Sequence, residues 1–341
     1  MAPRVLIFGA GSLGAVYAWV LSRAIPESNI TAICRSNYDA VSRDGFTVNS
    51  VTWGPDLHVR PQVVRSISDA VAQSQSQPFD YILVTCKALP TIPSTAELIR
   101  PAITPGTTTV VLLQNGIGIE EEYARKYAGD NVPILSTVAY LPATQTAPGV
   151  VRHDIVERLH IGTYPASGVP ETHKQAAELF AGLLKRGGAT AVLHDDVQAE
   201  RWGKLIINGS WNPICALTRL MDKAFMASGK INDEGGENEE NEAILFVRDV
   251  MLEIASVAQA CGQKDINEEL VDLQLGRAVA RVAPGIRPSM LGDALDGKAL
   301  EVDAIIGNIV KIAREKNVPV PMLRTLYVLV QGLNASFSLT K

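Results

Sequence analysis

The first half of the chain alternates short runs of apolar residues with segments of helical pattern. The apolar runs lack the polar–apolar alternation of strands that have one solvent face, so we expect strands of a parallel sheet buried on both faces. These runs are Val5–Phe8, Ile30–Cys34, Tyr81–Thr85, Thr108–Leu113 and Ile134–Tyr140. Strands separated by helical segments are typical of βαβ units, and the pattern therefore predicts an α/β fold with a doubly wound sheet.

The pattern changes near residue 194, where long helical segments replace the β-type runs. Three weaker segments before this point are predicted as extra strands at a sheet edge, namely Thr47–Trp53, Val150–Val156 and Leu159–Thr163. The helical segments after it are Ala243–Cys261, Glu268–Val282 and Leu300–Glu315. We therefore predict an α/β domain over residues 1–194 and a mainly α-helical domain over residues 195–341.

Charge and composition narrow the class of partner. The net charge of −5 over 341 residues gives no overall basic field for nucleic acid, and we expect no nucleic-acid partner. The uncharged run between Arg4 and Arg23 is interrupted by three glycines and a serine. We interpret it as a strand followed by a helix rather than a signal peptide or membrane anchor, which predicts a cytoplasmic protein without a membrane partner.

Cysteine and histidine spacing argues against a metal enzyme. The four cysteines are widely separated and form no CxxC pair, and the five histidines form no HExxH motif. A disulfide framework and a zinc site are both disfavoured, and a reducing compartment is indicated. The acidic stretch at residues 229–242 is predicted to be a solvated loop between helices.

A glycine-rich motif directly follows the first predicted strand. The residues Gly9-Ala10-Gly11-Ser12-Leu13-Gly14 lead into a helical stretch, Ala15–Leu21. In a Rossmann-type fold the first glycine makes the tight turn, the second lets the backbone approach a pyrophosphate, and the third lets the helix pack on the strand. The helix N-terminus offers free N–H groups to phosphates. The motif predicts dinucleotide binding; the alternative is a purely structural turn.

The second strand ends in a basic residue, Arg35, followed by Ser36. A site selective for NAD usually has an acidic residue here to bind the ribose 2′-hydroxyl, whereas an arginine can pair with the 2′-phosphate of NADP. We therefore expect NADP(H) as the cofactor. An exposed arginine that merely begins a loop is the alternative.

A row of polar residues crosses an otherwise apolar segment in the second half. Lys204, Asn208 and Asn212 are spaced by four, so a helix places them along one face. Gly209 and Pro213 are expected to distort or end that helix. A lysine in a partly desolvated cleft can have a lowered pKa and can protonate an oxygen that gains charge as hydride arrives. A polar contact between helices is the alternative reading.

Two later segments are open to ordinary structural readings. Ser289 precedes an apolar segment and could be a helix cap. Glu301 and Asp303 open another apolar helix, where first-turn acids favour the helix dipole.

Taken in order and spacing, these motifs resemble the ketopantoate reductases (2-dehydropantoate 2-reductases) over nearly the whole chain. The resemblance rests on the N-terminal GAGSLG, on Thr85-Cys86-Lys87-Ala88 and Gln114-Asn115-Gly116, on the Trp-Gly-Lys-Leu…Asn…Asn-Pro block, and on Ser-Met-Leu…Glu-Val-Asp. It implies a reductase that uses NADPH on a 2-oxo acid in pantothenate biosynthesis. Domain closure would bring the lysine and the glutamate onto the nicotinamide.

The resemblance also implies residue roles. Lys204 would be the general acid that protonates the ketone oxygen, and Glu301 would hold the substrate's hydroxyl group. Asn115 would lie near the nicotinamide and the reacting carbon, and Lys87 would lie close to the cofactor. Both follow strands of the sheet, where ligands of open α/β sheets bind. The substrate's carboxylate and hydroxyl groups would be bound by Asn208, Asn212 and Ser289.

Several positions depart from the family pattern. Gln114 stands where the family often has histidine, and Ile306 stands before Gly307 where it often has asparagine. The 229–242 stretch and the Ile286-Arg287 pair are also atypical. Two alternatives therefore stay open: a reductase of the same fold acting on a different carbonyl or imine, and a catalytically silent NADP(H)-binding regulator. The apolar helices of the second half fit a homodimer interface or an internal core equally well.

Overall fold

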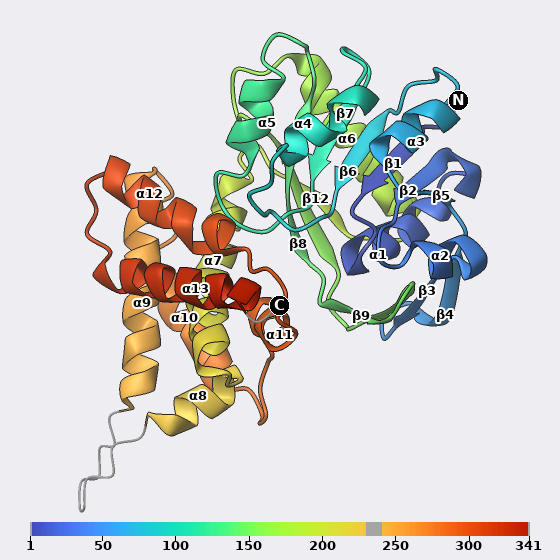
Figure 1. The fold of residues 1–341 in the computed structure, drawn as a ribbon. Helices are drawn as coiled ribbons and strands as arrows, with labels where there is room; N and C mark the ends of the chain where they lie inside the picture. The colour runs from blue at the N-terminus through green and yellow to red at the C-terminus, as the bar shows by residue number, and fades with distance from the viewer. Residues whose placement is uncertain (1, 230–240, 340–341) are drawn as a thin grey trace, which may run out of the picture. The chain divides into compact units, whose positions relative to one another are not determined.

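The computed structural model describes residues 2–229 and 241–339, shown in Figure 1. The chain divides into two compact units. One comprises Met1–Gln114 and Ile119–Val197, and the other comprises Asn115–Gly118 and Gln198–Lys341. The predicted boundary near residue 194 falls just before the chain enters the second unit, but the short segment at 115–118 was not expected to belong to that unit.

An eight-stranded sheet forms the centre of the first unit. Its strand order is β12-β11-β8-β7-β6-β1-β2-β5. The pairs from β5 to β8 are parallel, β11 is antiparallel to β8, and β12 is parallel to β11. The bounds are β1 (Val5–Phe8), β2 (Ile30–Ile33), β5 (Gln62–Val64), β6 (Tyr81–Val84), β7 (Thr109–Leu112), β8 (Ile134–Tyr140), β11 (Arg158–Thr163) and β12 (Ala191–Leu193). Four of the five predicted strands are buried throughout and β8 is nearly so, which confirms the doubly wound fold.

A second sheet of four strands has the order β4-β3-β10-β9. Its strands are β3 (Phe46–Ser50), β4 (Gly54–Val59), β9 (Ala143–Ala147) and β10 (Val150–His153). Two of the three predicted edge strands lie here rather than at the edge of the main sheet. In β3, buried positions alternate with half-buried ones, as in a sheet with one face on the core. Trp53 packs between Trp19 and His153, with ring centroids 5.1 and 4.9 Å away.

The third predicted edge strand, β11, lies inside the main sheet between β8 and β12. The predicted edge position of β11 was therefore wrong, because β12 pairs with its outer side. β12 was not predicted, since it has only three residues and no clear apolar pattern. The helices of this unit are α1 (Ser12–Ser22), α2 (Tyr38–Asp44), α3 (Ile67–Gln73), α4 (Thr95–Ile99), α5 (Glu120–Lys126) and α6 (Glu171–Arg186), with short 3₁₀ turns at Glu27–Asn29 and Arg100–Ala102.

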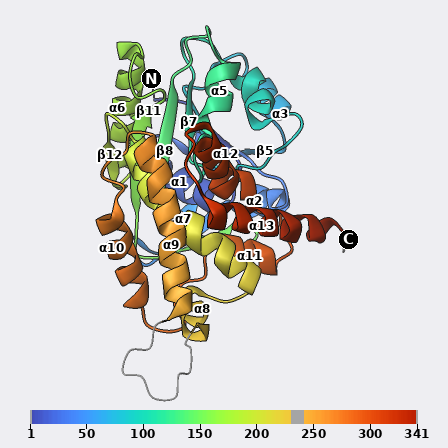
Figure 2. The ribbon, with the colours of Figure 1, turned by 90° about the vertical axis from the view of Figure 1, so that its left-hand side faces the viewer.

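The second unit is helical, as predicted. Its helices are α7 (Gln198–Thr218), α8 (Asp222–Ser228), α9 (Glu242–Ala260), α10 (Glu268–Val279), α11 (Ser289–Leu295), α12 (Asn308–Glu315) and α13 (Pro321–Leu339), and a π-helical turn covers Asp303–Gly307. Helix α7 packs against α9, α11 and α13, so it runs through the centre of this unit (Figure 2). Within the described residues, no helix combines the length and apolar character needed to cross a bilayer.

Helix α7 ends at neither Gly209 nor Pro213, contrary to one expectation from the sequence. Gly209 faces neighbouring helices: a Cβ at this position would lie 2.8 Å from Cδ1 of Ile254 on α9. Pro213 is buried within the helix and removes only one backbone hydrogen bond. Packing on these neighbours offsets that loss, and the polar row of α7 therefore lies on one continuous helix.

Most of the acidic stretch predicted as a loop, residues 230–240, lies outside the described residues. The chain is described again from Asn241, which caps α9. Its side-chain oxygen accepts hydrogen bonds from the backbone N–H groups of Ala243 and Ile244 at 3.1 and 3.2 Å.

Candidate active site

The glycine-rich turn links β1 to α1 and is tightly enclosed at its start. Gly9 has a φ of +103°, and a Cβ there would lie 2.4 Å from the backbone nitrogen of Cys86. The Thr85 hydroxyl donates to the carbonyl of Gly9 at 2.6 Å, and the Asn37 amide donates to the carbonyl of Ala10 at 2.8 Å. Only glycine therefore fits at position 9, and two neighbouring loops fix the turn. Sequence reasoning selected neither Asn37 nor this role of Thr85.

The turn is open at its second glycine. Gly11 is exposed, and a Cβ there would meet no atom within 4 Å. Helix α1 begins at Ser12 without a side-chain cap, so its first N–H groups stay available to a ligand. Gly14 instead packs closely, since a Cβ there would lie 2.8 Å from the carbonyl of Gly9. The open backbone at a helix N-terminus fits a pyrophosphate.

Two cations follow strands of the same sheet. Arg35 is exposed after β2, and its guanidinium makes no hydrogen bond or ion pair with any residue of 2–229 or 241–339. Ser36 beside it is also exposed. Lys87 is half-buried in the loop after β6. Arg35 is thus accessible to a phosphate group.

Gln114, the residue that departs from the predicted family pattern, joins the loop after β6 to helix α5. Its amide donates to the carbonyl of Cys86 at 3.1 Å and accepts from the Tyr123 hydroxyl at 3.2 Å. Both contacts are made to residues of the first unit. A neutral histidine could also supply one donor and one acceptor, so these contacts show what Gln114 does but do not explain the departure.

The segment after Gln114 is held by the helical unit. The backbone N–H of Ile117 donates to the carbonyl of Ala304 at 3.0 Å, and the Asn308 amide donates to the carbonyl of Ile117 at 2.6 Å. The buried guanidinium of Arg201 donates to the carbonyl of Gly116 at 2.7 Å. These bonds fix the position of Asn115. Arg201 and Asn308 were not selected from the sequence, although Arg201 directly precedes the Trp-Gly-Lys-Leu block.

Lys204 meets Asn115 in this unit. The lysine Nζ donates to Oδ1 of Asn115 at 2.9 Å. The pKa of Lys204 is lowered from the ordinary 10.5 to about 8: burial is the largest cause, the positive charge of Arg201 also lowers the pKa, and the negative charge of Glu301 opposes both. Glu301 itself is only 8% exposed. The negative charge of Glu301 therefore favours the protonated form of the Lys204 amine.

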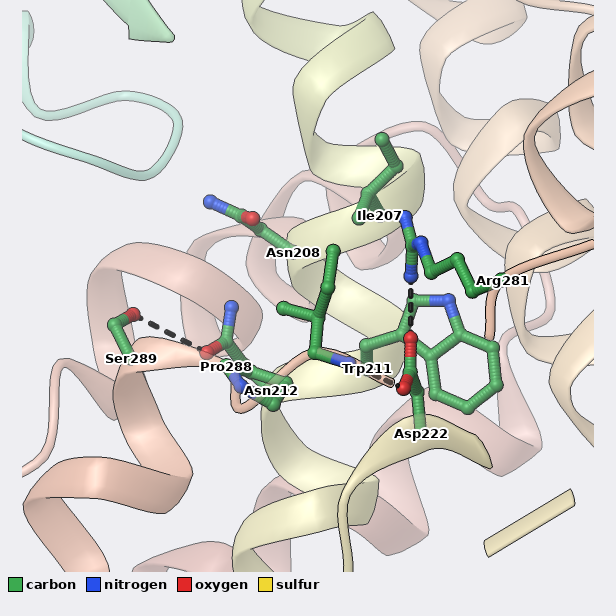
Figure 3. Close-up of a pocket in the computed structure, with 9 residues that line it drawn as sticks. Ile207, Asn208, Trp211, Asn212, Asp222, Arg281, Pro288 and Ser289 are labelled. Atoms are coloured by element: carbon green, nitrogen blue, oxygen red, sulfur yellow. Dashed lines mark hydrogen bonds and ion pairs between the residues drawn. The ribbon is translucent and has the colours of Figure 1, made fainter. Parts of the chain in front are cut away.

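The other predicted substrate residues border one cavity of about 110 Å³ (Figure 3). Asn212, 3% exposed, accepts at Oδ1 from the Met290 backbone N–H at 2.9 Å and from the Ser289 hydroxyl at 3.3 Å. Ser289 makes no side-chain cap at the start of α11, so the capping alternative is wrong. Asn208 lines the same cavity.

Asp303 differs in role from Glu301. Its carboxylate accepts from the hydroxyl of Tyr327 on α13 at 3.0 Å, within the π-helical turn. It therefore links two helical segments. In the structure, Lys204 donates a hydrogen bond to Asn115, and the charge of Glu301 acts on Lys204. The cavity is lined by Asn208, Asn212 and Ser289 among others.

Comparison with known proteins places these features in a family context. The chain matches the models "Ketopantoate reductase PanE/ApbA" over residues 5–166 and "Ketopantoate reductase PanE/ApbA C terminal" over residues 196–334. An uncharacterized protein of Saccharomyces cerevisiae is 29% identical, with 96% of this chain and 94% of that protein covered. A 2-dehydropantoate 2-reductase of Nostoc sp. is 26% identical, covering 95% and 93%.

Solved structures agree with these matches. A 2-dehydropantoate 2-reductase from Methylococcus capsulatus is 29% identical with a TM-score of 0.79, and 98% of each chain is covered. A D-mandelate dehydrogenase solved with NADH and anilino(oxo)acetate has the same fold, with a TM-score of 0.79 at 21% identity over 98% of this chain and 99% of that one. The predicted fold class and family resemblance are both confirmed.

Proposed function

The chain belongs to the ketopantoate reductase family, and from this premise we propose that it reduces a small 2-oxo acid to the 2-hydroxy acid with NADPH. The first candidate substrate is 2-dehydropantoate, which would place the protein in pantothenate biosynthesis. The observation that carries the proposal is the Lys204 amine, which lies 2.9 Å from Asn115 with a pKa lowered to about 8 beside the Glu301 carboxylate.

The first unit fits a dinucleotide. The open backbone at Gly11 and the uncapped N-terminus of α1 would hold the pyrophosphate. The accessible guanidinium of Arg35, with Ser36, would hold a 2′-phosphate, and Lys87 would lie close to the cofactor. When bound, NADPH supplies the hydride that reaches the ketone carbon.

The helical unit supplies the proton and the substrate contacts. As the carbonyl oxygen gains negative charge, a proton moves to it from Nζ of Lys204, and the neutral amine is reprotonated from solvent. Asn115 accepts a hydrogen bond from the same nitrogen and so orients the amine. Glu301 would hold a hydroxyl group of the substrate. The carboxylate would be bound by the amide nitrogens of Asn208 and Asn212, and by the Ser289 hydroxyl once its hydrogen turns from Oδ1 of Asn212 to the substrate.

Lys204→Met tests this proposal. Purified protein should oxidise NADPH with 2-dehydropantoate, and the variant should lose about 100-fold or more of kcat, the usual contribution of a general acid. NADPH binding, measured by its fluorescence, should be unchanged. Lys298→Met is the matched control, because Lys298 is exposed and pairs only with Asp296 among the described residues. Equal turnover by Lys204→Met and the control would remove the lysine from the mechanism.

A substrate panel tests the acid itself. NADPH oxidation is compared for 2-dehydropantoate, pyruvate and 2-oxoisovalerate at matched concentrations. The highest kcat/KM is expected for 2-dehydropantoate, because Glu301 is buried near Lys204 and can accept from the substrate hydroxyl. A higher value for an acid without a hydroxyl group would instead favour a different carbonyl substrate.

A further inference from the structure

The cavity of the helical unit extends beyond the predicted substrate residues. Figure 3 shows Asn208, Asn212 and Ser289 at one end and the ion pair of Arg281 with Asp222 at the other. The full lining is Ile207, Asn208, Trp211, Asn212, Asp222, Arg281, Ile286, Pro288 and Ser289. The Arg281 end is part of no motif that carries the family resemblance.

Asp222 holds Arg281 in place. The Asp222 carboxylate is 1% exposed and forms an ion pair with Nη1 of Arg281. It also accepts from the backbone N–H groups of Ile286 at 2.7 Å and Lys223 at 2.8 Å. A Cβ at Gly285 would lie 2.0 Å from the same carboxylate, so the chain wraps closely around it. Three donors therefore fix the carboxylate, and the carboxylate fixes the guanidinium.

Most of the Arg281 donors remain available. A guanidinium carries five N–H groups, and Asp222 is the only acceptor that the Arg281 guanidinium has among the residues described. The side chain is 26% exposed and lines the cavity. A planar guanidinium with free N–H groups is suited to bidentate binding of a carboxylate.

Other groups in the cavity are also donors without an acceptor. Oδ1 of Asn212 accepts from Met290 and Ser289, and Figure 3 shows its amide nitrogen turned away from Ser289. Asn212 is only 3% exposed, yet this nitrogen has no hydrogen-bond acceptor in the described part of the chain. The indole N–H of Trp211 is buried without a described partner. Donors without a described acceptor therefore lie at both ends of the cavity, and a ligand with acceptors at both ends would satisfy them.

We propose that the Arg281 end of the cavity is a second acid-binding subsite, which extends the substrates beyond 2-dehydropantoate, an acid with one carboxylate, to 2-oxo acids with a second carboxylate remote from the ketone. This inference rests on the proposed function for the chemistry at Lys204. The carboxylate next to the ketone binds the Asn212 and Ser289 end, and the remote carboxylate binds Arg281. Arg281 is thus a residue that determines specificity, and Asp222 positions it.

Matched acids test the subsite by turnover. The rate of NADPH oxidation is compared for 2-oxoglutarate against 2-oxopentanoate and for 2-oxoadipate against 2-oxohexanoate, which differ only in the remote carboxylate. Wild-type kcat/KM should favour at least one diacid by about tenfold or more, as expected for a charge-assisted hydrogen bond. Arg281→Met should abolish this preference and leave the monoacids little changed. Arg287→Met, an exposed arginine of the same loop, should keep it.

Calorimetry separates failure of the subsite from failure of the proposed reaction. Glutarate and pentanoate contain no ketone, so their binding to the wild-type protein with NADPH does not depend on turnover. Glutarate should bind about tenfold more tightly, and Arg281→Met should remove the difference. If no 2-oxo acid is reduced but glutarate is preferred through Arg281, the reaction is wrong and the subsite stands.

Three results would overturn the subsite. One is equal binding of glutarate and pentanoate by the wild type. The second is an equal loss for monoacids and diacids in Arg281→Met, which would make Arg281 the anchor of the single carboxylate. The third is full retention of the diacid preference in Arg281→Lys, which would contradict a role for the planar guanidinium. Arg281→Lys keeps a cation beside Asp222, is used if Arg281→Met does not fold, and should lose part of the preference.

Discussion

Glu301→Gln should shift the pH dependence of reduction through the pKa of Lys204. The lysine must be protonated to act as the acid, so kcat/KM falls as pH rises through its pKa of about 8 in the wild type. The Glu301 charge favours the protonated amine and so raises this pKa, against the opposite effects of burial and Arg201. Neutral glutamine keeps the shape but removes the charge, and the alkaline limb should move to lower pH.

The magnitude follows from how much the carboxylate can contribute. As a general scale, two unit charges ~6 Å apart at an effective dielectric of 20 interact by about 2.8 kcal/mol, which is roughly two pKa units, and reorganisation will reduce this. A shift of only about one unit already lowers the protonated fraction at pH 8 from about one half to about one tenth. Protonation alone should then lower kcat/KM at that pH about fivefold.

The assay is a pH profile of kcat/KM at saturating NADPH, from about pH 5.5 to pH 10. Glutamine also weakens any contact of Glu301 with a substrate hydroxyl, which lowers the whole profile without moving it. Using 2-oxoisovalerate, which has no hydroxyl group, removes that contribution. The midpoint of the alkaline limb therefore measures the electrostatic effect, whereas its height does not.

Asp303→Asn is the matched control, because Asp303 lies two residues further on and bonds Tyr327. It is not among the groups that shift the pKa of Lys204, so its alkaline limb should coincide with that of the wild type. An unchanged midpoint in Glu301→Gln, or a limb that moves to higher pH, would refute the coupling of the two side chains.

Three further substitutions test the cofactor turn and the segment that carries Asn115. Gly11→Val should fold normally, because a Cβ there meets no atom within 4 Å, but should weaken NADPH binding about tenfold or more by fluorescence titration; unchanged affinity would mean that no ligand approaches this backbone. Arg35→Asp should reverse the preference for NADPH over NADH in kcat/KM, and an unaltered ratio would reject the phosphate role. Gly116→Ala should lower the free energy of unfolding of the helical unit by roughly 1–3 kcal/mol, measured by thermal unfolding. The reason is that Gly116 has a φ of +104° and that a Cβ there would lie 2.2 Å from the Ala304 carbonyl oxygen. A wild-type Tm would contradict this.

The sequence predicted those features whose cause is local. A strand buried on both faces reads as a continuous apolar run, and β1 and β8 were predicted with the bounds that the structure has. The four-residue spacing of the polar row needs only an intact helix, which α7 provides. Position 9 needs glycine because of its own φ and the nearby Cys86 backbone. In each case the sequence neighbourhood contains the physical reason.

Features set by pairing between distant segments could not be predicted. The segment 115–118 follows a sheet strand in sequence but is held by bonds from Arg201, Ala304 and Asn308. Each of these partners lies at least 80 positions away, and nothing in the Asn-Gly pair specifies them. Likewise Asp222 and Arg281, 59 positions apart, have no shared pattern. Charge at one position does not reveal which opposite charge the fold will bring to it.

Ile286 shows why a departure in side chain can mislead. The sequence marks the Ile286-Arg287 pair as atypical of the family and close to the predicted substrate residue Ser289, which points to a change of substrate. In the structure the functional group at this position is the backbone N–H, which donates to Asp222 at 2.7 Å, while the side chain is 49% exposed. Every residue except proline supplies that donor, so residue identity carries little information here. This backbone contact helps to position the Arg281 guanidinium. The guanidinium, and not the isoleucine side chain, therefore decides whether the site takes a second carboxylate.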